Sequence, residues 1–202
     1  MSGAGDSAGM LLVQMEPPAT LEDEFHAWYD TEHVPERDAL PGFNSAVRFV
    51  CTQGWPRYMA CYDLTSLAVL EGDEYRRIGG SNLSIWSKRV LARVIGYERL
   101  ELSLFHGDPA TRPGNGKAMI RIASDDLDGV ARAAARLADS APQASVRVWK
   151  NAAPAGETTI MLDAPAAALI PDWPAAALAE AVGDLAGSLV GVWRYTRYRR
   201  WT

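Results

Sequence analysis

The strongest constraint on the fold of this sequence is one order of strand and helix patterns that occurs twice, on either side of a break. The break is the Gly- and Pro-rich stretch HGDPATRPGNG at residues 106–116, a composition typical of a linker. Before it, apolar segments predict strands, and apolar residues at helical spacing predict helices. The predicted strands are 10–16, 43–52, 57–64 and 96–105, and the predicted helices are 20–33 and 66–94, the latter interrupted by GGSN at 79–82.

The order β-α-β-β-α-β is that of the ferredoxin-like unit, and it returns after the break. There the predicted strands are 117–123, 144–152, 157–163 and 188–201, and the predicted helices are 125–139 and 173–187. The halves share almost no sequence, so we infer a duplication from element order and a period of about 100 residues. The predicted organisation is a flexible leader at 1–9, a first unit at 10–105, the linker at 106–116 and a second unit at 117–202.

An antiparallel sheet with two helices on one side leaves its other face apolar, and that face must be buried. A second copy on the same chain supplies the partner. The sequence therefore predicts the α+β class, with tandem duplicated ferredoxin-like units packed sheet to sheet as a pseudo-dimer within one chain. A homodimer of such chains is compatible with the sequence.

The composition excludes several classes of partner. The formal net charge is −5, whereas nucleic-acid binding favours a basic surface; the C-terminal WRYTRYRRWT alternates as a last strand would. The N-terminus has no cationic start followed by an apolar core, and no apolar run reaches the ~20 residues of a membrane span. We therefore expect a cytoplasmic protein with a small-molecule partner, neither nucleic acid nor membrane. Cys51 and Cys61 lack metal-ligand spacing and predict buried free thiols.

One nine-residue stretch, WYDTEHVPE at residues 28–36, concentrates aromatic, acidic and imidazole groups on a predicted helix. Tyr29 and His33 are four residues apart and therefore share a helix face, with Phe25 one turn earlier. This pattern predicts a catalytic pair, with His33 as general base and Tyr29 as its hydrogen-bond partner. We expect a His33 pKa close to the ordinary value of ~6.5. The alternative is structural: Val34 precedes Pro35, so the helix should end or kink at His33, which would cap it.

Other side chains are candidates for binding substrate. Trp28 would form a wall of the cleft, Glu32 or Asp30 would orient the imidazole, and Trp86 would close the cleft as a lid. Tyr62 lies on the strand 57–64, at the same parity as Tyr58. His26 lies off the Phe25 face and is predicted to be a surface residue.

Arg48 lies among apolar neighbours on the strand 43–52. Inside a barrel, its charge would need a carboxylate, such as Glu16 or Glu101, or else a substrate anion. Both the structural and the substrate-binding interpretations stay open.

No motif for a metal or cofactor is present in the sequence. The histidines at positions 26, 33 and 106 are scattered and predict no metal site. No nucleophile elbow, phosphate loop or dinucleotide fingerprint follows a strand. His33 would be the one candidate axial ligand for a haem. We therefore predict no cofactor and no metal.

The residues 10–105 resemble the dimeric α+β barrel superfamily, and within it the EthD-like proteins and their relatives. The first helix of those proteins carries a Tyr and then a His before a Pro, followed by a PGF-type turn. The residues that match this pattern are Tyr29, His33, Pro35, Pro41, Gly42 and Phe43, and the aromatic hairpin and helix around Tyr58, Tyr62, Trp86 and Arg89 are also similar. The second half matches only in element order.

The resemblance implies chemistry on small, often aromatic molecules, because the superfamily includes cofactor-free oxygenases, cyclases, isomerases and decarboxylating enzymes. Together with the His–Tyr pair, it predicts a cofactor-free acid–base enzyme of the isomerase, cyclase, dehydratase or decarboxylase (lyase) type, acting on an aromatic or polyketide-like substrate. The alternatives are a cofactor-independent monooxygenase and a non-catalytic ligand-binding protein. We expect one active cleft, in the first half, with the second half as scaffold.

Overall fold

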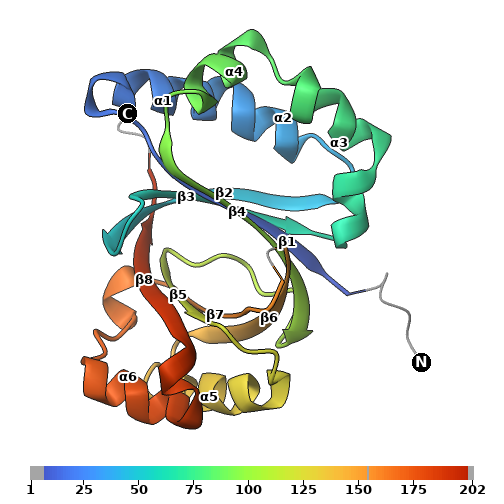
Figure 1. Cartoon of the computed structure of the whole chain (residues 1–202). Coiled ribbons are helices and arrows are strands. Elements are labelled where there is room, and N and C mark those ends of the chain that lie inside the picture. The colour runs from blue at the N-terminus through green and yellow to red at the C-terminus, as the bar shows by residue number, and fades with distance from the viewer. Residues whose placement is uncertain (1–6, 154, 200–202) are drawn as a thin grey trace.

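Eight antiparallel strands form a closed barrel with helices on two opposite sides (Figure 1). The computed structural model describes residues 7–153 and 155–199. Most of the predicted leader lies outside this range, and Gly9 already belongs to the first strand. None of the described helices is both long and apolar enough to span a membrane.

The first half contains four strands and the helices drawn above the barrel in Figure 1. The strands are β1 (Gly9–Glu16), β2 (Phe43–Gln53), β3 (Tyr58–Leu64) and β4 (Ile95–His106). The helices are α1 (Glu22–Trp28), α2 (Val34–Asp38), α3 (Asp73–Ile78) and α4 (Ile85–Leu91). A π turn, Tyr29–His33, joins α1 to α2, and 3-10 turns lie at Ala19–Leu21, Leu67–Glu71 and Gly80–Asn82.

The second half follows the same order, and its helices lie on the opposite side of the barrel (Figure 1). Its strands are β5 (Gly116–Ile122), β6 (Ser145–Ala153), β7 (Thr158–Ala164) and β8 (Leu189–Arg197). Its helices are α5 (Leu127–Asp139) and α6 (Ala175–Val182), with 3-10 turns at Ala167–Leu169 and Gly183–Ser188. Alanines on α5, including Ala133 and Ala134, pack against the sheet.

The barrel closes in the strand order β1-β3-β2-β8-β5-β7-β6-β4. Two seams join the halves: β2 pairs with β8, and β4 pairs with β6. In each seam the second strand of one half meets the fourth strand of the other. The two sheets therefore pack face to face and are also hydrogen-bonded to each other along both edges. Closure leaves no sheet edge with unpaired backbone groups.

The sequence predicts that the helix carrying WYDTEHVPE ends or kinks at His33; it does not end there, and a π turn, Tyr29–His33, interrupts the regular helix instead. The helix passes through the π turn, where the Val34 amide donates to the Tyr29 carbonyl, and continues as α2 to Asp38. The wider turn lets the helix continue past the Pro35 ring. The second predicted helix also differs: Gly72 is extended and separates the 3-10 turn Leu67–Glu71 from α3.

Alternation along each strand divides the core into three parts. Met10 and Leu12 of β1 face the barrel interior, whereas Leu11 and Val13 face the helices of the first half. The third part lies between the second sheet and α5 and α6. Both cysteines are free thiols; Cys61 is buried in the barrel interior, whereas Cys51 is only partly buried, which differs from the prediction.

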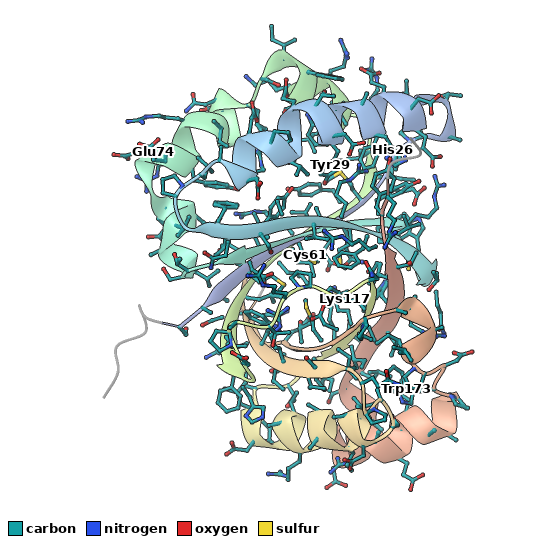
Figure 2. All side chains as sticks on the ribbon, turned by 180° about the vertical axis from the view of Figure 1, so that it is seen from behind. His26, Tyr29, Cys61, Glu74, Lys117 and Trp173 are labelled. Atoms are coloured by element: carbon teal, nitrogen blue, oxygen red, sulfur yellow. The ribbon has the colours of Figure 1, made fainter. Side chains whose placement is uncertain are left out.

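Four buried charges cross the barrel interior and connect the halves. Arg147 donates to Asp63 of the first half at 2.9 Å and to Asp163 at 3.1 Å, and Lys117 forms an ion pair with Asp163. Figure 2 shows Lys117 inside the barrel, between the two helical layers. Burial raises the pKa of Asp163, but the two cations outweigh it and hold that pKa below its usual value. The carboxylate therefore stays ionised.

Replacing Asp163 with Asn should strongly destabilise the protein, because it leaves the fully buried Lys117 ammonium without an anionic partner. Breaking such a pair costs roughly 3–5 kcal/mol of unfolding free energy, measurable by urea denaturation. The control is Asp73→Asn, which breaks an exposed ion pair to Arg76 and should cost less than about 0.5 kcal/mol. Equal losses of unfolding free energy in the two variants would contradict a buried ion pair between Lys117 and Asp163.

Candidate functional site

A pocket of about 640 Å³ lies on the outer face of the first sheet, beneath the helices of the first half. Its apolar wall consists of Leu11, Val13, Met15, Leu67, Leu70, Leu83 and Leu91. Its polar wall consists of His33, Arg37, Tyr62, Glu71, Tyr75, Tyr97, Arg99 and Glu101. Gly79 and Gly80 border it, and Ala152 is the residue of the second half in the described lining. The volume suits a small organic molecule.

Strand alternation explains which side chains reach this pocket. On β4, Tyr97, Arg99 and Glu101 face the pocket, whereas Leu100 and Leu102 between and beyond them face the barrel interior. Arg99 contacts its neighbours in turn: it forms an ion pair with Glu101, and its Nη2 lies 3.5 Å from the Tyr75 hydroxyl. The strand β4 therefore supplies three residues of the polar wall, and Tyr75 joins them from α3.

His33 reaches the pocket from the end of the π turn and is only 8% exposed. Its ring packs on Trp28 at 4.1 Å and edge-on to Tyr29 at 5.2 Å, measured between ring centroids. Its Nδ1 has no hydrogen-bond partner among the described residues. Burial lowers the pKa of His33 well below its ordinary value, and the positive charges of Arg37 and Arg48 lower it further. This corrects the expected pKa near ~6.5, and His33 is neutral at neutral pH.

Tyr62 shares the pocket with His33. Its side chain is 1% exposed, and its hydroxyl lacks a hydrogen-bond partner within the described part of the chain. Burial raises the pKa of Tyr62 well above its usual value, so the phenol stays protonated. The pocket thus combines a neutral imidazole, which can accept a proton, with a phenol that can donate a hydrogen bond.

Tyr29 has a different role from the one predicted. Its hydroxyl points to the Met15 sulfur at 3.9 Å, and the Arg48 guanidinium lies over its ring at 4.3 Å. Tyr29 touches His33 through its ring and is not part of the described pocket lining. The hydroxyl assigned to His33 from helical spacing is therefore directed elsewhere, and Tyr62 takes its place in the pocket.

Trp28, Glu32 and Trp86 hold helices together and do not enter the pocket. Trp28 donates to the Ser87 hydroxyl at 3.0 Å. Glu32 accepts hydrogen bonds from Ser84 at 2.5 Å and from Ser87 at 3.1 Å, so it does not orient the imidazole. Trp86 donates to a carboxylate on α1 rather than closing the cleft. These contacts fix α4 against the helix that carries His33.

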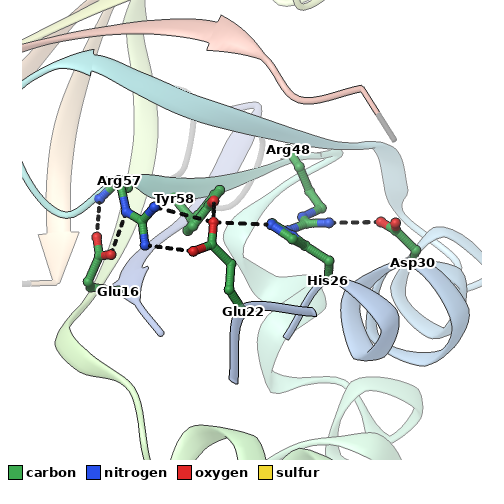
Figure 3. A network of polar contacts seen from close by, with 7 residues as sticks. All are labelled: Glu16, Glu22, His26, Asp30, Arg48, Arg57 and Tyr58. Carbon is green, nitrogen blue, oxygen red and sulfur yellow. Dashed lines mark hydrogen bonds and ion pairs between the residues drawn. The ribbon is translucent and has the colours of Figure 1, made fainter. Parts of the chain in front are cut away.

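Arg48 points outward from the barrel, toward α1, which corrects the prediction of an interior arginine (Figure 3). It pairs with Asp30 at 2.8 Å and donates to Nδ1 of His26 at 2.8 Å. Its guanidinium lies between the rings of Tyr29 and Tyr198, 4.3 and 4.1 Å from their centroids. Strand alternation causes this, since Val47 and Phe49 face the interior and residue 48 must face the helices.

His26 is half-buried in the same network, not a surface residue as predicted. Its ring stacks on Tyr198 at 4.7 Å. Burial and then the Arg48 charge lower the pKa of His26, so Nδ1 can accept from Arg48. The carboxylates expected for Arg48 have other partners: Glu16 binds Arg57, as Figure 3 shows, and Glu101 binds Arg99.

Sequence reasoning missed several residues of the polar wall, notably Arg37, Tyr75, Tyr97 and Arg99. The sequence alone could have indicated Arg37, because this residue follows His33 by four positions and so lies on the same helix face. It is 4% exposed and donates to the His33 carbonyl at 3.3 Å. Tyr97 and Arg99 alternate along β4, but only the fold shows which side of that strand forms the pocket.

Among the described residues, no three His, Cys, Asp or Glu side chains gather as a metal site would require. The charges in the pocket wall are balanced, because the lining contains two arginines, Arg37 and Arg99, and two glutamates, Glu71 and Glu101. The groups available for chemistry are therefore an imidazole, phenols, and charged side chains.

No protein-family model matches the sequence, and no curated protein matches it. Solved structures do match. An anthrone oxidase-like protein is similar with a TM-score of 0.64 at 12% identity, over 96% of this chain and 92% of that chain. A putative monooxygenase from Lactobacillus acidophilus NCFM has a TM-score of 0.55 at 10% identity, over 95% and 94%. A mutant chlorite dismutase from Candidatus Nitrospira defluvii has a TM-score of 0.57 at 8% identity, over 98% and 93%.

These likenesses confirm the dimeric α+β barrel fold, here closed within one chain. At identities of 8–12% they carry the fold alone. The pocket residues must therefore be judged by their own geometry.

The buried neutral His33 should make stability depend on pH. Its pKa is lowered in the folded protein, so below the ordinary value of ~6.5 the unfolded chain binds more protons and folding weakens as pH falls. The slope of unfolding free energy against pH should be smaller in His33→Gln by up to about 1.4 kcal/mol per pH unit. Urea unfolding between about pH 7.5 and pH 5, a range that brackets ~6.5, measures this slope. The exposed His106→Gln should leave the slope unchanged; equal slopes in all three proteins would contradict the burial of a neutral His33.

Proposed function

We propose that this chain is a small-molecule enzyme that removes a proton from an enolisable or phenolic aromatic substrate bound in the 640 Å³ pocket. The observation that carries the proposal is the pair His33 and Tyr62. Both line the pocket, and each has a buried polar atom without a hydrogen-bond partner in the described residues. Such atoms are uncommon in folded proteins and favour a role toward a ligand.

The proton would pass to a nitrogen of His33. Because the imidazole is neutral, it can act as a base at neutral pH without first losing a proton. Its lowered pKa also limits its strength. The substrate must therefore be acidic, or its anion must be stabilised by delocalisation and by the enzyme. A hydroxylated, polyketide-like ring system meets this requirement.

The resulting anion would be stabilised by donors already in the pocket wall. Tyr62 stays protonated and can donate to an oxyanion, and Arg37 and Arg99 place positive charge beside it. Preorganised donors of this kind lower the barrier because they need not reorient as charge develops. Tyr97, which is 52% exposed, stands at the mouth, where substrate would enter.

The fate of the anion decides the reaction class, and we propose a cofactor-free oxidase or monooxygenase reaction. A delocalised carbanion can give an electron pair to dioxygen, forming a C–O bond and a peroxide. Loss of the remaining hydrogen on that carbon, with cleavage of the O–O bond, releases water and leaves a carbonyl. Support comes from the fold, which this chain shares with an anthrone oxidase-like protein and putative monooxygenases.

We also propose two statements about the evolutionary origin of the chain. Each half has the strand order fourth-first-third-second, and the seams are reciprocal, which supports a tandem duplication of one ferredoxin-like unit. The EthD-like pattern around Tyr29 and His33 supports a relationship of the first half to that group.

Anthrone is the probe that tests the proposal. Two measurements separate the steps: deuterium exchange at the acidic carbon under anaerobic conditions, and oxygen uptake in air. We expect the wild-type chain to catalyse both. His33→Gln should lower both rates by about 10²–10⁴-fold, the usual share of general acid–base catalysis. Tyr62→Phe should lower them by about 10²–10³-fold, as for loss of one oxyanion donor.

Tyr29→Phe is the matched control, because it removes a hydroxyl that contacts only the Met15 sulfur among its described hydrogen-bond partners. It should keep wild-type rates, and thermal unfolding of each variant shows whether the fold is retained. Exchange without oxygen uptake would exclude the oxygenase and favour an isomerase or cyclase. Binding of anthrone without exchange would favour a ligand-binding protein.

A further inference from the structure

A second pocket, of about 460 Å³, lies at one open end of the barrel. It is bordered by the ends of strands from both halves, including β2, β3, β6 and β8, and by residues 109–113 of the segment between the halves. It faces the barrel interior, because Trp149 of its lining belongs to the interior core. The sheet therefore separates it from the pocket of His33, and it is independent of the proposed function.

The lining of this second pocket is positively charged. Arg112, Arg147 and Arg197 contribute to it, and Asp63 is the carboxylate in its described lining. Asp63 is already engaged, since it accepts from Arg147 at 2.9 Å and from Ser45 at 2.7 Å. Arg112 and Arg197 are exposed, and neither forms an ion pair with any described residue. A net positive charge therefore remains at the mouth.

Two buried hydrogen-bond donors in the same wall have no acceptor. The Nε of Arg147 and the Nε1 of Trp149 lack a partner within the described residues, and each side chain is only 1% exposed. Folded proteins seldom leave N–H groups buried and unpaired. Both groups can only donate, so they would be satisfied by an acceptor and not by a cation.

We infer that this barrel-end pocket binds an oxyanion, namely a carboxylate or phosphate group of a small molecule. The indole of Trp149 and the guanidinium of Arg147 lie on the interior side, and Arg112 and Arg197 flank the entrance. The positive charge and the two unpaired N–H donors match an anion, whose oxygens accept hydrogen bonds. The pocket volume admits a small organic anion but not a polymer.

The test uses the full chain and isothermal titration with two probes, inorganic phosphate and benzoate, at constant ionic strength. We expect one anion to bind per chain, and tighter binding of one probe identifies the group. Trp149→Phe removes the indole N–H but keeps an aromatic ring, and it should weaken binding by about tenfold or more. The double variant Arg112→Gln, Arg197→Gln should weaken it at least as much.

The matched control is Arg76→Gln with Arg77→Gln, which makes the same change of charge on α3, away from this pocket, and should leave binding unchanged. Arg112 and Arg197 are exposed, so their variants keep the interior intact even if Trp149→Phe unfolds. Failure of both probes to bind would overturn the inference. So would binding that the arginine variants leave unaltered, because the anion would then lie elsewhere.

Discussion

The closure of the barrel is the constraint on which the rest of the structure depends. Each four-stranded sheet has two open edges and one apolar face without helices, and both problems are solved by the same partner sheet. The seams β2–β8 and β4–β6 pair the edges, and the enclosed faces form a common core. Because both seams join the same two halves, neither half can shift along the other without breaking hydrogen bonds in both seams. Figure 1 shows the helices on the two outer faces that remain.

Closure also explains how charge can be buried at the centre. Asp63 and Arg147 lie 84 residues apart in the chain and meet only because the two sheets enclose one interior. Arg147 and Lys117 both bind Asp163, so the cluster pairs two cations with two carboxylates. A cluster of this kind contributes little net stability compared with apolar packing, but it disfavours arrangements that leave a buried charge unpaired. Here it connects the halves in one register.

The first sheet then separates two sites of different character. Its outer face, beneath the helices, holds a mostly apolar pocket in which His33 is neutral and Tyr62 is protonated. Its inner face leads to a cationic pocket at the barrel end. The π turn matters for the outer site, because it carries the helix past Pro35 and sets Arg37 beside the His33 carbonyl. Unusual helical turns of this kind often occur at functional sites.

The sequence by itself determined the features that depend on local period. Alternation decided which strand residues share a face, and helical spacing put His33 and Tyr29 together, as their ring contact shows. Only the tertiary structure decided which face becomes a pocket and which partner each polar group meets. Arg48 therefore binds Asp30 rather than an interior carboxylate, and Tyr62 rather than Tyr29 joins His33 in the pocket. The physical reason is that burial and long-range pairing arise from barrel closure, which no local pattern encodes.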